Sequence, residues 1–200
     1  MIQNIKKDEW AVVLDFLAKG HSGMSRSQPA AQVIGDKYFS LLEVIIREGN
    51  ALKPGDKVYI GDKKRDQVQY ISGRIEMKDL TAAAKDELLD CIEKIVESNQ
   101  EYFLKFFNES TSLTTRQHQL ELLPGVGKKH LWAILDERKV GPFKSFDEIK
   151  TRVPLIPDPK TMVVKRIIEE LEEKDRYSFF VLKLKEQEDK KPVREVLARA

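Results

Sequence analysis

The order of hydrophobic and polar positions divides the 200-residue chain into a β-rich first part and a helical second part. Over the first 80 residues, short apolar runs are separated by Gly, Pro, Asp and Lys, a pattern typical of strands and turns. The runs lie at residues 10–17, 32–35, 38–47, 52–61 and 68–77. Short strands at this spacing predict a small OB-like β-barrel or sandwich over residues 1–80.

A helical pattern begins at Thr81. Residues 82–105 contain neither Gly nor Pro, and their apolar side chains recur at helical spacing. Residues 81–110 carry seven acidic residues against three lysines, so a polyanion would avoid this segment. We therefore predict that residues 81–110 form a connecting helix that packs the two parts of the chain together.

The most informative stretch is Leu-Leu-Pro-Gly-Val-Gly-Lys-Lys at residues 122–129. Before it, Thr114 and Gln117 have the spacing of a capping box, which predicts a helix from Thr114 to about Leu122. After it, apolar residues at helical spacing predict a second helix that begins near Lys128. The two glycines allow the chain to reverse in a few residues, so we predict a helix, a tight hairpin and a helix.

This hairpin has the chemistry of an anion site. The first N–H groups of a helix have no partner within it, and the positive end of the helix dipole lies there. We expect Gly125, Val126, Gly127 and Lys128 to hold a nucleic-acid phosphate through backbone amides, with Lys129 adding charge. The alternative is a helix turn that uses glycine only for its geometry.

A weaker copy of the hairpin follows after 30 residues, because Leu-Pro-x-Val at 123–126 aligns with Val-Pro-x-Ile at 153–156. Leu155 and Pro157 stand in the places of the glycines, and Asp158 stands in the place of Lys128. A coincidence in a proline-containing loop is the alternative. We predict that residues 111–176 form a helix-hairpin-helix domain whose second hairpin has kept its shape and lost its phosphate chemistry.

Ser145 and Glu148 form another capping box, and Asp158 followed by proline predicts the start of a helix that runs to about Lys174. The apolar run at 177–184 then reads as a strand, and a single strand is not stable alone. We expect it to return to the barrel, followed by a charged tail at 185–200. The predicted fold class is therefore α+β, a small OB-like barrel plus an all-α domain.

A second basic segment lies in the predicted barrel, where Lys63, Lys64 and Arg65 are adjacent in a turn between two strands. These cations predict a further contact with nucleic acid, and the alternative is an ordinary solvated hairpin. Tyr59 and Tyr70 could stack on bases if they face outward, as aromatic residues do on OB-fold surfaces, although such residues are more often part of a core.

The composition limits which kinds of binding site and cofactor site the chain can form. With 35 basic and 33 acidic residues the net charge is +2, so a nucleic-acid surface must come from local clustering. One cysteine, Cys91, excludes an intramolecular disulfide, and His21, His118 and His130 lack the spacing of paired metal ligands. We expect no metal and no cofactor. The single cysteine fits a reducing cytoplasm, and no apolar run is long enough to span a membrane.

Four segments together resemble a known family: AQVIGDKYFSLLEV, VYIGDKKRDQV, the stretch from FFNES to LTTRQHQLELLPGVGKKHLWAILDERK, and FKSFDEIKTRV. They are similar to an uncharacterised archaeal family described as RNA-binding proteins, over residues 10–184. The resemblance implies an OB-like β-barrel joined to a helix-hairpin-helix domain, a cytoplasmic location and a place among ribosome or RNA-processing factors. It implies no established activity.

We therefore predict a nucleic-acid-binding protein without catalysis, with RNA favoured over DNA as the partner. One alternative is a protein-interaction adaptor in a ribosome or RNA-processing complex, because degenerate hairpins of this kind often only pack against partners. Another is a DNA-repair enzyme with an aspartate about twenty residues after the hairpin. Asp147 lies at that distance, but it belongs to the capping box that begins at Ser145.

Overall fold

The computed structural model describes residues 7–20 and 28–182. Its sheet contains β1 (Trp10–Leu17), β2 (Ala30–Gly35), β3 (Leu41–Ile46), β4 (Lys57–Tyr59) and β5 (Val68–Arg74). Neighbouring strands are antiparallel, in the order β4-β1-β2-β3-β5. The five predicted strands are confirmed, although β3 and β4 are shorter than expected, and the predicted end of the fifth strand lies in a 3₁₀ helix at Met77–Asp79.

The sheet is a curled half-barrel rather than a closed one, because β4 and β5 lie at its two edges. Register shifts in β1 and in the β3–β5 pair allow the strands to bend. One face of the sheet encloses its own apolar cluster, which includes Val13, Val33, Val44 and Val58. Leu14 and Ile34 belong instead to the cluster that continues into the helices.

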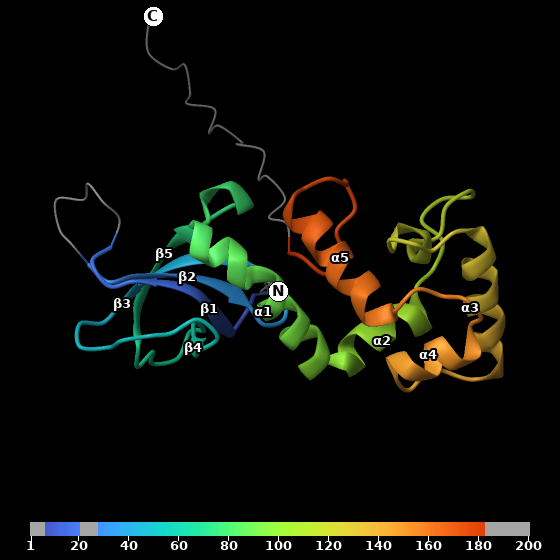
Figure 1. Ribbon diagram of the computed structural model, residues 1–200, viewed down its shortest axis with the longest axis horizontal. Coiled ribbons are helices and arrows are strands. Elements are labelled where there is room, and N and C mark those ends of the chain that lie inside the picture. The colour runs from blue at the N-terminus through green and yellow to red at the C-terminus, as the bar shows by residue number, and fades with distance from the viewer. Residues whose placement is uncertain (1–6, 21–27, 183–200) are drawn as a thin grey trace, which may run out of the picture.

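The helices are α1 (Ala82–Ser98), α2 (Gln100–Glu109), α3 (Lys128–Val140), α4 (Phe146–Arg152) and α5 (Pro159–Leu171). Figure 1 shows the sheet at one end of the molecule, α3 and α4 at the other, and α1, α2 and α5 between them. The predicted connector is therefore two helices, which meet at Asn99. The predicted helix starts at Ser145 and Asp158 are confirmed, since each side chain accepts a first-turn N–H. None of the helices in the described ranges is long and apolar enough to cross a membrane.

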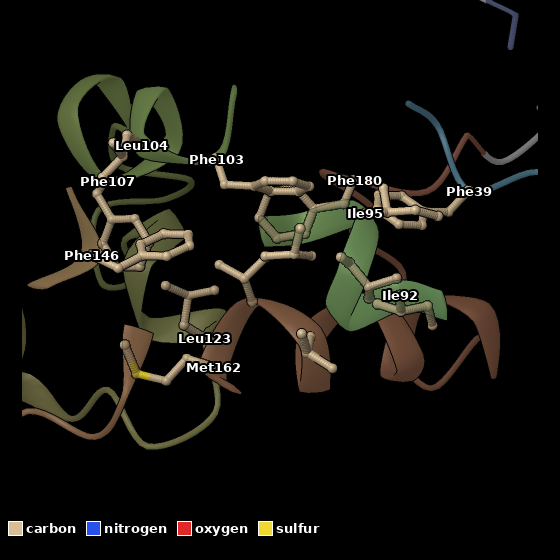
Figure 2. Close-up of a cluster of buried hydrophobic side chains, with 14 of the residues drawn as sticks. Phe39, Ile92, Ile95, Phe103, Leu104, Phe107, Leu123, Phe146, Met162 and Phe180 are labelled. Atoms are coloured by element: carbon tan, nitrogen blue, oxygen red, sulfur yellow. The ribbon is translucent and has the colours of Figure 1, made fainter. Parts of the chain in front are cut away.

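A single apolar cluster joins the sheet to the helices. Phe103 of α2 is central to it, with ring centroids 6.1 Å from Phe39, in the β2–β3 turn, and 5.5 Å from Phe180. Figure 2 shows the labelled side chains extending from Phe39, beside the sheet, to Phe146 of α4. This shared core fixes the helical part against the half-barrel.

The helix predicted from Thr114 to Leu122 is wrong. Thr114 Oγ1 does accept the Gln117 N–H, at 3.1 Å, but the following residues bend and then form a 3₁₀ helix at Gln119–Leu122. The reason is a competing cap: His118 Nδ1 accepts from Leu120 N at 3.1 Å, while Glu121 accepts from His118 N at 2.8 Å. These bonds start the helical turn at His118, four residues later than predicted.

The strand predicted at 177–184 is also wrong for the residues that are described, 177–182, which bend instead. The carboxylate of Glu170 accepts the N–H groups of Phe179, Phe180 and Val181, each at 2.9 Å, so these groups cannot form a strand ladder. The segment does return to the half-barrel, where Leu182 N donates to Tyr38 O at 3.0 Å. Residues 183–184 and the predicted tail at 185–200 lie outside the described residues.

Candidate functional site

The hairpin reverses the chain between the 3₁₀ helix and α3. Val126 N donates to Leu123 O at 3.0 Å to close the turn, and Gly125 has φ +91°, a conformation that favours glycine. The side chains of Leu123 and Val126 are buried in the core, whereas Gly125 and Gly127 are exposed. The Val126 side chain therefore does not face a phosphate, and its N–H group, which we predicted to hold one, is already donated to Leu123 O.

The N-terminus of α3 is uncapped by any described side chain, because its N-cap residue is Gly127. In contrast, α1, α4 and α5 are capped by the side chains of Thr81, Ser145 and Asp158. The first N–H groups of α3, like those of α2, thus lack the side-chain oxygen that caps α1, α4 and α5, and they lie at the positive end of the helix dipole. This arrangement is suited to accept an anion.

The two lysines after the hairpin differ in their surroundings. Lys128 Nζ lies 2.8 Å from Glu121 Oε1 and donates to Arg116 O at 3.0 Å, so its ammonium group is held against the hairpin. The hydrogen bond that Lys128 donates to the Glu121 carboxylate has the largest effect in lowering the pKa of Glu121, and the hydrogen bond from His118 N lowers it further. Lys129 is exposed and has no hydrogen-bond or ion-pair partner among the described residues. Lys129 is therefore the more available cation.

Acidic side chains near the hairpin have cationic partners. A shallow depression of about 470 Å³ is lined by residues 121–127 and by Glu169. The Glu121 carboxylate is paired with Lys128, and Glu169 Oε2 lies 3.7 Å from Arg166 Nη1. These pairs reduce the repulsion that an incoming anion would meet.

The second turn, at residues 153–157, keeps the shape of the hairpin. Leu155 has φ +60° at the position aligned with Gly125, and its side chain is 84% exposed. The turns also touch each other, because a Cβ added to Gly125 would lie 2.9 Å from Pro157 Cγ. Asp158, which caps α5, pairs with Lys150 at 2.6 Å. A carboxylate at this helix start disfavours an anion there.

The basic turn between β4 and β5 is a separate surface. Lys63 and Lys64 are exposed and have no side-chain partner in the described ranges, but Arg65 braces the turn by donating to Gly61 O at 2.8 Å. Figure 1 places β4 and β5 at the sheet end of the molecule and α3 at the opposite end. The structure therefore does not bring Lys63, Lys64 and Arg65 together with the hairpin.

The two predicted stacking tyrosines lie at opposite sheet edges. Tyr59 of β4 is partly buried beside Trp10, with ring centroids 5.1 Å apart, so it packs mainly within the protein. Tyr70 of β5 is exposed, and its hydroxyl donates to Gln28 Oε1 at 3.1 Å.

Sequence reasoning missed Trp132, whose side chain is 61% exposed on α3. The sequence does indicate this exposure, because Trp132 lies outside the apolar stripe of the predicted helix, which consists of Leu131, Ile134 and Leu135. The residue lies one turn beyond Lys128, close to the hairpin.

Within the described ranges, no three His, Cys, Asp or Glu residues gather as metal ligands would. Burial raises the pKa of the Cys91 thiol to about 11, so it stays protonated at neutral pH.

Comparison with known proteins identifies relatives over most of the chain. A family model described as "Protein of unknown function (DUF655)" matches residues 7–182. "Uncharacterized protein MJ0038" of Methanocaldococcus jannaschii is 37% identical over 178 residues, which cover 88% of this chain and 81% of that protein. The crystal structure of Af1531 from Archaeoglobus fulgidus is similar with a TM-score of 0.80 and 46% identity, covering 88% of this chain and 100% of that chain. The resemblance to an uncharacterised archaeal family is thus confirmed, together with a mixed α+β fold.

Proposed function

We propose that this protein, which belongs to the DUF655 family, binds nucleic acid by its phosphate backbone at the hairpin of residues 123–127. Binding depends little on base sequence, because backbone amides and lysines contact groups that every nucleotide carries. RNA is the proposed ligand ahead of DNA, and no reaction is proposed.

The observation that carries this proposal is the uncapped N-terminus of α3 beside exposed Gly127 and Lys129. The pair of turns at 123–127 and 153–157 supports it, since they pack together and only the first presents open amides. We interpret the pair as a helix-hairpin-helix unit in which a 3₁₀ helix replaces the first helix. We interpret the half-barrel as OB-like.

Fluorescence anisotropy of the full chain with a labelled single-stranded RNA, and with DNA of the same sequence, tests the proposal. Gly127→Val adds a side chain in front of the amides, at a position where a Cβ meets nothing within 4 Å in the protein. We expect it to weaken binding by about 10- to 100-fold, the equivalent of one or two charge-assisted hydrogen bonds. Lys129→Ala should weaken it by about threefold to fivefold.

Lys85→Ala is the matched control, because Lys85 is an exposed lysine on the acidic helix α1. Its affinity should equal that of the unmodified chain. Absence of binding to either nucleic acid at low salt would refute the proposed function. Equal affinities for the Gly127→Val and unmodified chains would remove the hairpin from the binding site.

A further inference from the structure

A groove beside the hairpin is not used by the phosphate contact. It lies between the loop of residues 110–118 and α3, with a volume of about 460 Å³. Its lining combines an indole, two cationic residues and several hydroxyl-bearing ones, represented by Trp132, Arg116, Lys128, Thr114 and Thr115.

Trp132 gives the groove its most unusual feature. The buried side chains of α3 are Leu131 and Ile134, whereas Trp132 is mostly exposed beside this apolar stripe and contributes little to the core. It also lines a neighbouring depression with Leu135 and Pro142. The indole therefore stands between two hollows, where a planar group can reach it.

The cations lie toward the hairpin end of the groove. Lys128, one helical turn before Trp132, links the groove to the hairpin through Glu121 and the carbonyl of Arg116. The Arg116 side chain is exposed and has no ion-pair partner among the described residues. The edge nearest the phosphate site is thus positive, as a polyanion requires.

We infer that this groove is a nucleobase site, in which a base stacks on Trp132 while the adjoining phosphate lies at the hairpin. The inference rests on the proposed function and adds a substrate class to it: single-stranded or unpaired nucleic acid. A base inside a duplex has both faces covered by its neighbours, so it cannot stack on the indole. The cationic edge favours nucleic acid over a protein partner, because the cores of protein interfaces are depleted in charged residues.

Binding assays with three probes test the inference: a single-stranded RNA, the same length of abasic sugar-phosphate strand, and the RNA duplex. Trp132→Ala should weaken binding of the single strand by about 5- to 150-fold, as expected for the loss of one stacked base. Trp132→Phe, which keeps an aromatic face, should restore most of it. Affinity for the abasic strand and for the duplex should be the same with and without Trp132.

Fluorescence provides an independent readout, because the chain has only two tryptophans. In a Trp10→Phe background Trp132 is the sole reporter, and stacking of a base should quench it when the RNA strand, but not the abasic strand, is added. Unmodified binding of RNA by Trp132→Ala would overturn the nucleobase site while leaving the phosphate site intact. Failure of the unmodified chain to bind either strand would refute both. Self-association that Trp132→Ala abolishes would overturn the inference in favour of a protein contact.

Discussion

Arg166 and Glu170, one turn apart on α5, form a buried ion pair with Arg166 Nε 3.0 Å from Glu170 Oε1 and exposures of 2% and 1%. Arg166 also donates to Leu122 O at 3.4 Å, behind the hairpin, and to Tyr177 O at 2.6 Å. Glu170 accepts the N–H groups at 179–181. This one ion pair therefore contacts both Leu122, at the entry to the hairpin, and the segment that returns to the half-barrel.

Glu170→Gln should destabilise the protein by about 3 to 5 kcal/mol, the range for removing one partner of a buried ion pair. The substitution keeps the shape of the side chain. It removes the negative charge that pairs with Arg166 and replaces an acceptor oxygen with a donor NH₂ group. Chemical denaturation of the two full-length chains measures the free energy of unfolding.

Lys139→Ala is the control for this measurement, because it breaks the exposed Lys139–Asp136 pair, at 2.7 Å, on a helix surface. Its cost should stay under about 1 kcal/mol. If Glu170→Gln costs no more than Lys139→Ala, the buried pair does not organise this part of the fold.

The glycines of the hairpin should differ in their effect on stability. Gly125→Val places a branched side chain at φ +91° and against Pro157, so we expect a loss of about 1 to 3 kcal/mol from strain. Gly127→Val has free space and an extended backbone, with φ −91° and ψ 179°, and should cost less than about 1 kcal/mol. Thermal unfolding of both variants tests this order, and equal melting temperatures would contradict it.

The sequence predicted most of the fold because its local signals agree with the tertiary structure. The apolar runs became strands, and Ser145 and Asp158 begin helices, since each such signal acts over a few neighbouring residues. The two wrong predictions, the helix from Thr114 and the strand from residue 177, concern segments whose N–H groups bond to a side chain that the local pattern does not reveal. Glu170 captured the amides of the expected last strand, and His118 displaced Thr114 as the cap.

The candidate site was less predictable. Sequence position identified the glycines and lysines, but it could not show that Lys128 is paired with Glu121 while Lys129 is unpaired among the described residues. Nor could it show that the basic turn at residues 63–65 lies far from α3, because that depends on how the shared core orients the two parts. Trp132 was detectable as an aromatic residue outside the helical apolar stripe.

Protonation of His118 should loosen the loop that forms one wall of the groove. Burial, aided by the positive charge of Arg138 and only partly opposed by Glu121, lowers the pKa of His118 below its ordinary value of 6.5. The unfolded chain then binds a proton near pH 6.5 that the folded chain does not yet bind, so stability falls as the pH drops below about 6.5. The melting temperature should therefore be lower at pH 5.5 than at pH 7.5, at constant ionic strength.

His118→Asn is the matched variant, because an asparagine oxygen can accept the Leu120 N–H and does not titrate. It should reduce the change in melting temperature between these two pH values. The carboxyl groups with lowered pKa, such as Glu121 and Asp158, lose stabilisation only in more acidic solution, below their ordinary values of 4.5 and 3.8. An unchanged pH dependence in His118→Asn would exclude His118 as its source.

Binding should weaken steeply as salt is added, because phosphate contacts release condensed counterions. With about three contacts to a single strand, the logarithm of the affinity should fall against the logarithm of salt concentration with a slope of about −2. Lys129→Ala should make the slope shallower by about 0.7. Titration of one RNA strand at several salt concentrations gives both slopes, and a slope near zero would contradict phosphate binding as the main source of affinity.

Removal of the segment after α5 should unfold the junction between the two parts of the protein. In a chain that ends at Lys174, Glu170 loses the donors at 178–181 and Arg166 loses its contacts with Asp175 and Tyr177. The α2 aromatic rings also lose Phe179 and Phe180, whose centroids lie 5.1 Å from that of Phe106. We expect aggregation, or a loss of about 3 kcal/mol or more in the free energy of unfolding, because apolar surface and buried charges are left without cover.

A chain that ends at Leu182 retains all of these contacts and is the control. Light scattering and thermal unfolding of both truncated chains, beside the full chain, distinguish a structural segment from a dispensable one. We expect the Leu182 chain to melt with the full chain and bind the same RNA with equal affinity. If the Lys174 chain instead stays monomeric and melts at the same temperature as the Leu182 chain, the core around Phe103 and Phe106 is sufficient without the returning segment. The Arg166–Glu170 pair would then be needed at most for its contact with Leu122 at the entry to the hairpin.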